Sequence, residues 1–304
     1  GEPIGWTFDA TSAKVMQIEV TPPRVSVPEN AVLPEVRLAP AIGGDLQLIG
    51  HDRLPAQLNA GDSFRFTLYW RANVSIAVKP TVWLRLVQSG AMPIVSEIEP
   101  VSGYPVAEWQ PGNTWRAEHV TRIPPGAAGG LWRVEIEIGG ADPSAPASAV
   151  LGEIDVSAPA HTFALPNIAI TQDAQFGDVA RLVGYDAPDR LTPGQVFTVT
   201  LYWQAVGETT ARYKVFVHLV DADGNRRAGD DATPAAGQRP TTGWMESEYI
   251  VDAHRLHLPE DAAGGDYLLF VGLYDENNLS RLNLLDGRDV APLSQTTRVE
   301  SLNP

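Results

Sequence analysis

Two nearly identical stretches, "FTLYWRA" at 66–72 and "VTLYWQA" at 199–205, place their Trp residues 133 positions apart. Apolar side chains alternate with others along both, which is the period of a β-strand. Other blocks recur around them in the same order, so the sequence predicts two copies of one fold. These blocks are "LQLIGHD" (46–52) with "ARLVGYD" (180–186), "VWLRLV" (82–87) with "VFVHLV" (215–220), "PVAEW" (105–109) with "PTTGW" (240–244), and "IPPGAAGGLWRVEI" (123–136) with "LPEDAAGGDYLLFV" (258–271).

The spacing of turn residues predicts an all-β protein. The 27 Gly and 25 Pro residues are spread through the chain, and short β-branched and aromatic runs lie between them without helical periodicity. We expect two tandem antiparallel β-sandwiches with an internal repeat of about 133 residues. Their topology is immunoglobulin-like or jelly-roll, since both share this strand pattern.

Each copy starts at a Leu-Pro pair, Leu33-Pro34 and Leu165-Pro166. Ahead of the first pair, "KVMQIEV" (14–20) holds the place that "VLGEIDV" (150–156) holds before the second. The N-terminal segment is therefore interpreted as the tail strand of a preceding unit or a strand contributed from outside, and we expect the natural chain to extend upstream of Gly1. The predicted division is an N-terminal segment at 1–32, a first sandwich at 33–158 and a second at 159–304.

Composition excludes several classes of function. With 37 acidic and 22 basic residues the chain carries a formal charge of −15, which disfavours nucleic acid and anionic membranes as partners. The absence of Cys excludes disulfides, thiolate zinc sites and thiol nucleophiles. The longest apolar run, "YLLFVGLY" at 267–274, is too short for a membrane helix and reads as a buried strand.

Side-chain parity predicts the core of each sandwich. On the Tyr-Trp strands every second residue up to Trp70 and Trp203 is apolar, and so is one face of the strand that follows each. The repeated Trp is therefore expected to be a structural anchor. The predicted core residues are Phe64, Phe66, Leu68, Trp70, Val82, Leu84 and Leu86, and Phe197, Val199, Leu201, Trp203, Val215, Val217 and Leu219.

The opposite parity of these strands combines aromatic rings with hydrogen-bonding groups, a combination that suits a sugar ligand. If the two strands are neighbours, the side chains form one surface in each copy. The second copy is favoured, because its face is less cationic. The alternative is that another part of the chain covers the rings, and that Trp109 and Trp244 close the sandwich ends. The ligand-binding candidates are Tyr202, Phe216, His218, Thr200, Trp244, Tyr69, Trp83 and Arg85.

The stretch "DADGN" (221–225) raises the question of calcium. Counted from Asp221, Gly224 is fourth and Ala232 twelfth, so the pattern fails as an EF-hand loop, and Asp-Gly favours a hairpin turn. Asp252 and His254 share one face of a strand, which alone is a weak pair. We expect no cofactor. A calcium site of another type would draw on Asp221, Asp223, Asp230, Asp231 or Asp275.

The second copy, from "RLVGYD" (181–186) through "VDAHRLHLP" (251–259) to "SRL" (280–282), resembles a known region. This is the extracytoplasmic β-sandwich region of glycosyltransferase-family-39-like (mannosyltransferase-type) membrane proteins of filamentous green bacteria. The likeness covers 181–283 well and the first copy more loosely, with His51 in place of Tyr185. It implies a non-catalytic accessory domain outside the membrane, accompanied by a membrane-embedded domain of the same full-length chain.

Three functions follow as hypotheses. The first is a non-enzymatic, extracytoplasmic accessory module that binds carbohydrate and is associated with cell-surface glycan machinery. The second is a structural spacer or protein-interaction module without a small ligand, which predicts that Tyr202 and Phe216 are buried. The third is a glycoside-acting hydrolase, which requires two carboxylates about 5–10 Å apart in one cleft. The sequence contains no recognisable catalytic motif.

Overall fold

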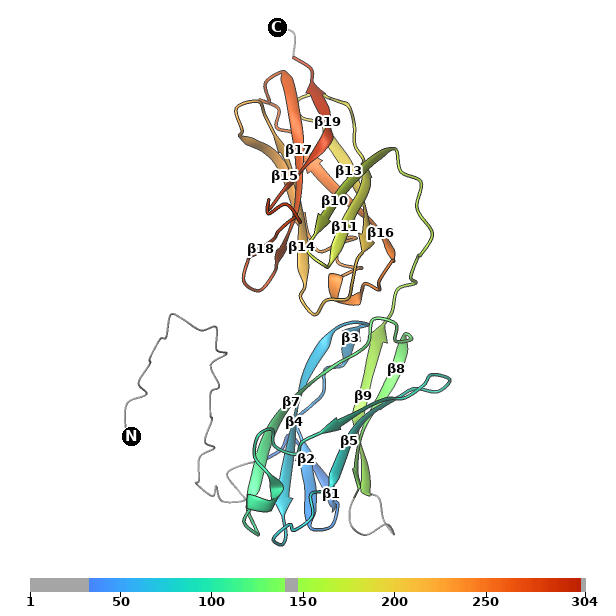
Figure 1. Ribbon diagram of the computed structural model, residues 1–304, viewed down its shortest axis with the longest axis vertical. Helices are drawn as coiled ribbons and strands as arrows, with labels where there is room; N and C mark the ends of the chain where they lie inside the picture. Colours follow the sequence, from blue (N-terminus) through green and yellow to red (C-terminus); the bar gives the residue numbers. More distant parts are fainter. Residues whose placement is uncertain (1–32, 140–146, 302–304) are drawn as a thin grey trace, which may run out of the picture.

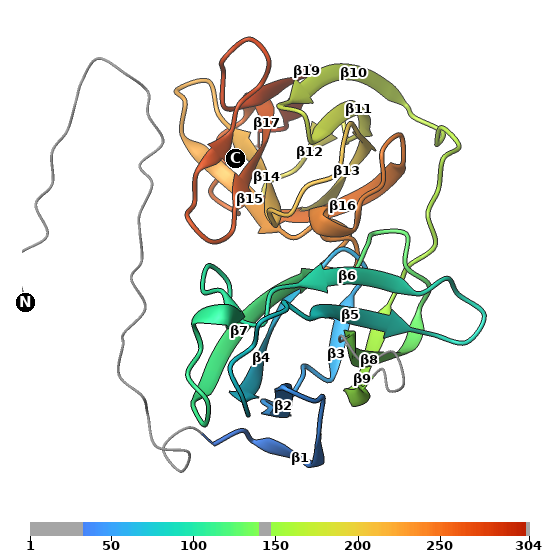
Figure 2. The same cartoon turned by 60° about the horizontal axis from the view of Figure 1, so that its bottom comes forward.

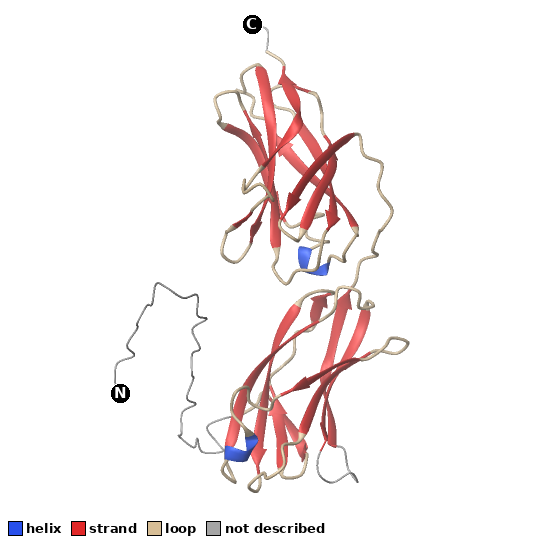
Figure 3. Cartoon of the chain, viewed as in Figure 1, coloured by secondary structure: helices blue, strands red, loops and turns tan. Residues whose placement is uncertain are grey.

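The computed structural model describes residues 33–139 and 147–301, and within these ranges it confirms the predicted all-β class (Figures 1 and 3). Two short 3₁₀ turns, η2 (Val106–Glu108) and η3 (Thr241–Gly243), interrupt the strands. No helix in the described part of the chain is long and apolar enough to cross a membrane. The predicted N-terminal segment at 1–32 lies outside the described residues.

The first sandwich consists of two sheets. One has four strands in the order β1-β2-β4-β7, and the other has five in the order β3-β9-β8-β5-β6. The strands are β1 (Val36–Ile42), β2 (Leu46–His51), β3 (Gln57–Asn59), β4 (Ser63–Ala72), β5 (Thr81–Val87), β6 (Ile94–Ile98), β7 (Thr114–Arg122), β8 (Gly130–Gly139) and β9 (Ala147–Ser157).

The second sandwich has a four-stranded sheet in the order β10-β11-β13-β16 and a sheet in the order β12-β19-β17-β14-β15, with β18 paired to β17. The strands are β10 (Ile170–Phe176), β11 (Ala180–Asp186), β12 (Arg190–Leu191), β13 (Val196–Ala205), β14 (Tyr213–Val220), β15 (Arg226–Ala232), β16 (Tyr249–His257), β17 (Gly265–Asp275), β18 (Arg281–Leu282) and β19 (Ala291–Val299).

The prediction of purely antiparallel sheets needs one correction. β3 pairs with β9 in parallel, and β12 pairs with β19 in parallel. Each short strand lies on the path from one strand of the four-stranded sheet to the next. There the chain pairs briefly with β9 or β19, the last strand of each sandwich, which belongs to the opposite sheet, and it runs in the same direction as that strand.

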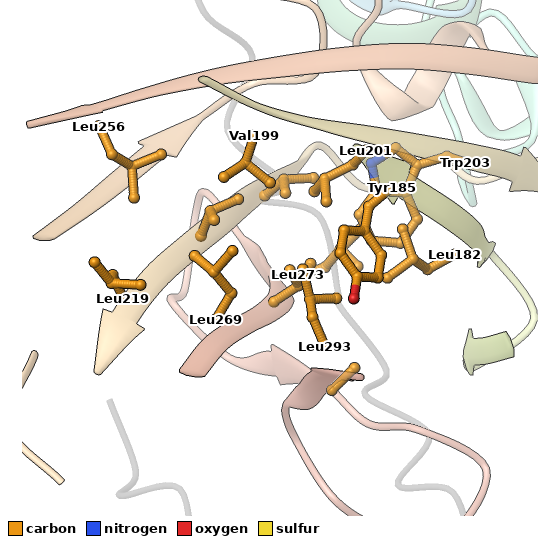
Figure 4. Close-up of a cluster of buried hydrophobic side chains, with 14 of the residues drawn as sticks. Leu182, Tyr185, Val199, Leu201, Trp203, Leu219, Leu256, Leu269, Leu273 and Leu293 are labelled. Carbon is orange, nitrogen blue, oxygen red and sulfur yellow. The ribbon is translucent and has the colours of Figure 1, made fainter. Parts of the chain in front are cut away.

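The predicted core is confirmed in both sandwiches. The inward residues of β4, β5, β13 and β14 are all buried, and Trp70 and Trp203 are completely so. Around Trp203, leucines and valines from both sheets meet, together with Tyr185 (Figure 4). Phe176 packs its ring edge-on against Trp203 with 5.8 Å between centroids. The repeated Trp is therefore an anchor of the core.

The predicted ligand surface required the Tyr-Trp strand and the following strand to be neighbours, and this condition is not met. β4 and β5 belong to different sheets of the first sandwich, and β13 and β14 belong to different sheets of the second. Residues 73–80 and 206–212 cross from one sheet to the other instead of closing a hairpin. The outward side chains of the two strands consequently lie on opposite sides of the sandwich, so no common surface exists.

Candidate functional site

Tyr69 and Tyr202 are structural and do not form an open ligand platform. Tyr69 and Tyr202 are only 4% and 7% exposed. Tyr202 Oη donates to Asp186 Oδ2 over 2.6 Å, and Tyr69 Oη donates to Asp52 Oδ1 over 2.9 Å. The hydrogen bond to Asp186, together with burial, raises the pKa of Tyr202 to about 12. Thr200, two residues before Tyr202, is half-buried.

Phe216 is also buried, at 2% exposed, although its side chain points out of the sheet. The ring lies across Gly272 on β17, where a Cβ would come within 2.3 Å of Phe216 Cζ. The guanidinium of Arg281 covers the ring at 4.9 Å from its centroid, a cation–π contact. The ring of His218 flanks it at 4.8 Å. The ring face that a sugar would need is therefore already occupied.

The remaining candidates are separated over the molecule. His218 Nε2 contacts Asp231 Oδ1 at 3.0 Å, beside Phe216. Trp83 is half-buried on β5 of the first sandwich, where Arg85 Nη1 donates to Glu137 Oε2 over 2.7 Å. Trp244 is buried at the end of η3 and donates from Nε1 to a backbone carbonyl, which fits its alternative role as an end plug. Phe216 and His218 lie side by side, but the structure does not bring the predicted site residues together on one surface.

The "DADGN" stretch forms the expected turn between β14 and β15. Gly224 has φ +83°, and the Asp221 carboxylate accepts from the backbone N–H groups of Asp223 and Asn225 over 3.1 and 2.8 Å. The bond from Asn225 lowers the pKa of Asp221. Within the described residues, no group of three or more His, Asp or Glu side chains is arranged to hold a metal ion.

The second sandwich contains a buried polar network around His254. His254 Nε2 lies 3.0 Å from Asp252 Oδ2, and His254 Nδ1 lies 2.8 Å from Asp230 Oδ2. Trp203 Nε1 donates to Asp252 Oδ2 over 3.2 Å. Since carboxylates only accept, both ring nitrogens of His254 can donate here only when the ring is protonated, so this geometry favours the imidazolium form.

The charge on His254 is set by two opposing effects. Burial lowers its pKa, but the hydrogen bonds and charges of Asp252 and Asp230 outweigh burial, so the pKa of His254 lies above its usual value. His254 and Asp252 are 0% and 1% exposed, so the cluster is closed to a substrate. It links β16 of one sheet to β15 of the other and acts as a clamp between them. The sequence pairs Asp252 with His254, but it does not reveal Asp230, which comes from the opposite sheet.

The matching position of the first sandwich lacks this clamp. Ala117 and Asp252 occupy matching positions, because they pair with Leu68 and Leu201 of the two Tyr-Trp strands. His119 and His254 match in the same way, since they pair with Phe66 and Val199. Trp70 Nε1 consequently has no hydrogen-bond partner in the described part of the chain. Burial lowers the pKa of His119, since no carboxylate compensates for it.

A second polar cluster joins the two sandwiches, which lie one after the other in Figures 1 and 2. Arg122, at the end of β7, donates to Glu208 Oε2 over 3.1 Å and to the carbonyls of Thr209 and Thr242 over 3.1 and 2.9 Å. Asp62 Oδ1 accepts from Thr242 Oγ1 over 3.1 Å and from Arg212 over 3.3 Å. Charged groups of each sandwich are thus satisfied by the other.

The backbones also approach closely at this junction. A Cβ on Gly61 would lie 2.0 Å from the carbonyl oxygen of Thr242, and a Cβ on Gly243 would lie 2.8 Å from that of Ala60. Any larger residue at either glycine would separate the sandwiches. The sequence analysis did not predict this cluster. The signal that could have indicated it is a difference between the copies, since Asp62 stands where the second copy has Gln195.

The connecting segment between β9 and β10 is held to both sandwiches. His161 Nδ1 lies 2.9 Å from Glu248 Oε2, and His161 Nε2 lies 3.2 Å from the carbonyl oxygen of Pro125. Tyr249 N donates to Thr162 O over 2.7 Å. Arg239 forms an ion pair with the fully buried Glu248. The linker is therefore a fixed part of the junction.

Comparison of the sequence with models of known families and with curated proteins gives no match. Among solved structures, the C-terminal domain of Wzt is 17% identical, over 43% of this chain and 78% of that one, with a TM-score of 0.33. A putative membrane-anchored protein from Corynebacterium diphtheriae is 11% identical over 82% and 59%, with a TM-score of 0.21. Red sea bream transglutaminase is 9% identical over 85% and 32%, with a TM-score of 0.24. At these scores, none of the likenesses bears on function.

Proposed function

We propose that this chain is a rigid, non-enzymatic spacer module that holds its neighbours in a longer extracytoplasmic protein at a fixed separation and orientation. The observation that carries the proposal is the junction, where Arg122 and Asp62 of the first sandwich bond to Thr242 and Arg212 of the second. A flexible tether would leave these charged groups in water, whereas here Asp62 and Thr242 are buried. Buried polar groups that are fully bonded specify one arrangement.

The burial of Tyr202 and Phe216 supports the spacer over a carbohydrate module that uses those rings. A hydrolase gains no support from Asp230 and Asp252. These two acids meet around His254, where the burial of His254 and Asp252 leaves no room for a substrate. The resemblance to the extracytoplasmic region of family-39-like glycosyltransferases is the ground for the proposed location and for a membrane-embedded domain as its neighbour.

Small-angle X-ray scattering of the chain and of the double variant Arg122→Ala/Asp62→Ala tests the spacer. The wild type is expected to fit one fixed arrangement of the sandwiches, and the double variant is expected to have a larger radius of gyration and to need many arrangements. Arg65→Ala is the matched control, because Arg65 forms an exposed pair with Glu118 within the first sandwich. Wild-type scattering that itself needs many arrangements would contradict the proposal.

A further inference from the structure

An open groove of about 420 Å³ lies at one edge of the second sandwich. Residues of β10 and β11 form one wall, and the loop between β18 and β19 forms the other. Its volume is in the range of small-molecule sites. None of the sequence-predicted ligand residues lines it.

The charged groups of the groove are neutralised in pairs. Arg181 donates from Nε and Nη2 to both oxygens of Asp173, over 2.7 Å each. On the opposite wall Arg288 Nε donates to Asp286 Oδ2 over 2.9 Å. The groove thus carries no net charge in a chain of formal charge −15, so neither a cation nor an anion is favoured as its ligand.

The groove still has free hydrogen-bonding capacity. Each guanidinium has five N–H donors and uses only some of them on its carboxylate. The half-buried side chain of Gln172 makes no hydrogen bond to any described residue, and Gln175 donates from Nε2 to the carbonyl of Gly177 but keeps its side-chain oxygen free. Planar amides and ion pairs of this kind match the adjacent hydroxyl groups of a sugar.

Apolar atoms supply the other half of the site. Leu285, which is 74% exposed, and Pro292 both line the groove. The C–H surface of a sugar ring can cover such groups while its hydroxyls bond to the walls.

An added peptide strand fits less well. The edge of β10 is already used by the chain itself, because Leu285 N donates to Gln175 O over 3.2 Å and Phe176 forms a bridge with Leu284. The register of β10 also shifts between Thr171 and Ala174. This irregularity interrupts the backbone pattern that a new strand would need.

We propose that this groove binds a short neutral oligosaccharide, with Gln172, Arg181 and Arg288 donating to its hydroxyls and Leu285 and Pro292 packing against its ring faces. The site is separate from the junction and does not depend on the spacer role. Its surface differs from the one that the sequence indicated, which included Tyr202 and Phe216.

The test is an NMR titration of the isotope-labelled chain with mannotriose, maltotriose and cellotriose, each to about 10 mM, which detects millimolar dissociation constants. The expected result is saturable shifts at Gln172, Arg181 and Leu285 with at least one sugar. Gln172→Ala and Arg288→Met are each expected to weaken that binding about tenfold. Arg298→Met is the control, because Arg298 forms a similar exposed pair with Asp266 outside the groove.

Three results would overturn the proposal. The first is the absence of saturable shifts at the groove with all three sugars. The second is equal binding by the groove variants and by Arg298→Met. The third is binding there of an unstructured neutral peptide with no binding of sugars, which would assign the groove to a peptide instead. The amide spectrum of each variant shows whether it is folded, so a loss of binding is separated from a loss of structure.

Discussion

At the scale of single residues, Asp252 is the hydrogen-bond acceptor that satisfies several buried polar groups of the second core. Its carboxylate accepts from Trp203 Nε1 and from the backbone of Ala235 over 3.2 and 2.8 Å, and it contacts His254. The first core has Ala117 at the matching position, and Trp70 Nε1 there has no hydrogen-bond partner in the described chain. Losing Asp252 would remove the acceptor of Trp203 Nε1, of the Ala235 N–H and of one ring N–H of His254, so it should cost more stability than the unpartnered Trp70 Nε1 costs the first core.

Asp252→Ala is therefore expected to lower the free energy of unfolding by about 3–5 kcal/mol, the usual effect of breaking a buried ion pair. Urea unfolding followed by Trp fluorescence measures the change. Asp266→Ala is the control, because that residue forms an exposed pair with Arg298 and should cost no more than about 1 kcal/mol. Equal losses of unfolding free energy in the two variants would show that the buried network contributes no more to stability than an exposed ion pair.

The raised pKa of His254 predicts a dependence of stability on pH. A histidine whose pKa is higher in the fold stabilises the fold fully below its unfolded value of about 6.5, and this stabilisation is lost as the pH rises through the folded pKa. The urea concentration at the unfolding midpoint is therefore expected to decrease as the pH rises above about 6.5. In His254→Gln this decrease with pH should be smaller. An unchanged slope in the variant would assign the effect to other groups.

At the scale of elements, alternation along a strand was enough to predict the core. It identified every inward residue from Phe64 to Trp70 and from Phe197 to Trp203. The surface could not be predicted in the same way, because a surface depends on which strands are neighbours. The crossing of residues 206–212 between sheets leaves no periodic trace in the sequence, so alternation alone suggests a common surface for Tyr202 and Phe216, which lie on opposite sides of the sandwich.

Glycines opposite aromatic rings are a device that both sandwiches use on their outer faces. Phe216 lies across Gly272, and Trp83 lies close to Gly139, where a Cβ would be 2.7 Å from Trp83 Cζ3. The missing side chain lets each ring lie flat on the neighbouring strand. This explains why outward aromatic residues are more buried than their parity suggests.

Gly272→Ala is accordingly expected to cost about 1–3 kcal/mol, as is typical of overpacking, because its Cβ would meet Phe216 and the nearby carbonyl of Asp289. The Phe216 ring should be displaced, which NMR shifts of its protons would show. Gly44→Ala is the control, since a Cβ there has no atom within 4 Å. A fully stable Gly272→Ala with an unmoved ring would contradict this account of Phe216.

At the scale of the whole molecule, the relation between the two sandwiches matters most. The repeat predicts two similar units but not how they meet, because the residues that join them are those in which the copies differ. Asp62 stands where the second copy has Gln195, and Thr242 stands where the first copy has Ala107. Such differences at otherwise matching positions are the signal by which the junction could be found.

The junction glycine Gly243 gives a prediction that needs no change of charge. In Gly243→Ala the new Cβ would lie 2.8 Å from Ala60 O, so the sandwiches must move apart and weaken the bonds of Asp62. We expect faster proteolytic cleavage in the connecting segment at 158–169, measured by limited digestion. Gly44→Ala serves again as the control, and cleavage equal to the wild type would show that the contact tolerates a methyl group.

The most direct test of the rigid spacer is the distribution of distances between two spin labels, one on each sandwich. The chain has no Cys, so Val120→Cys and Thr198→Cys, both at exposed positions, give two unique sites. Pulsed electron paramagnetic resonance should show one narrow distance peak, which becomes broad when Arg122→Ala is added. A broad distribution in the labelled chain with Arg122 intact would contradict the account, because the sandwiches would then move independently.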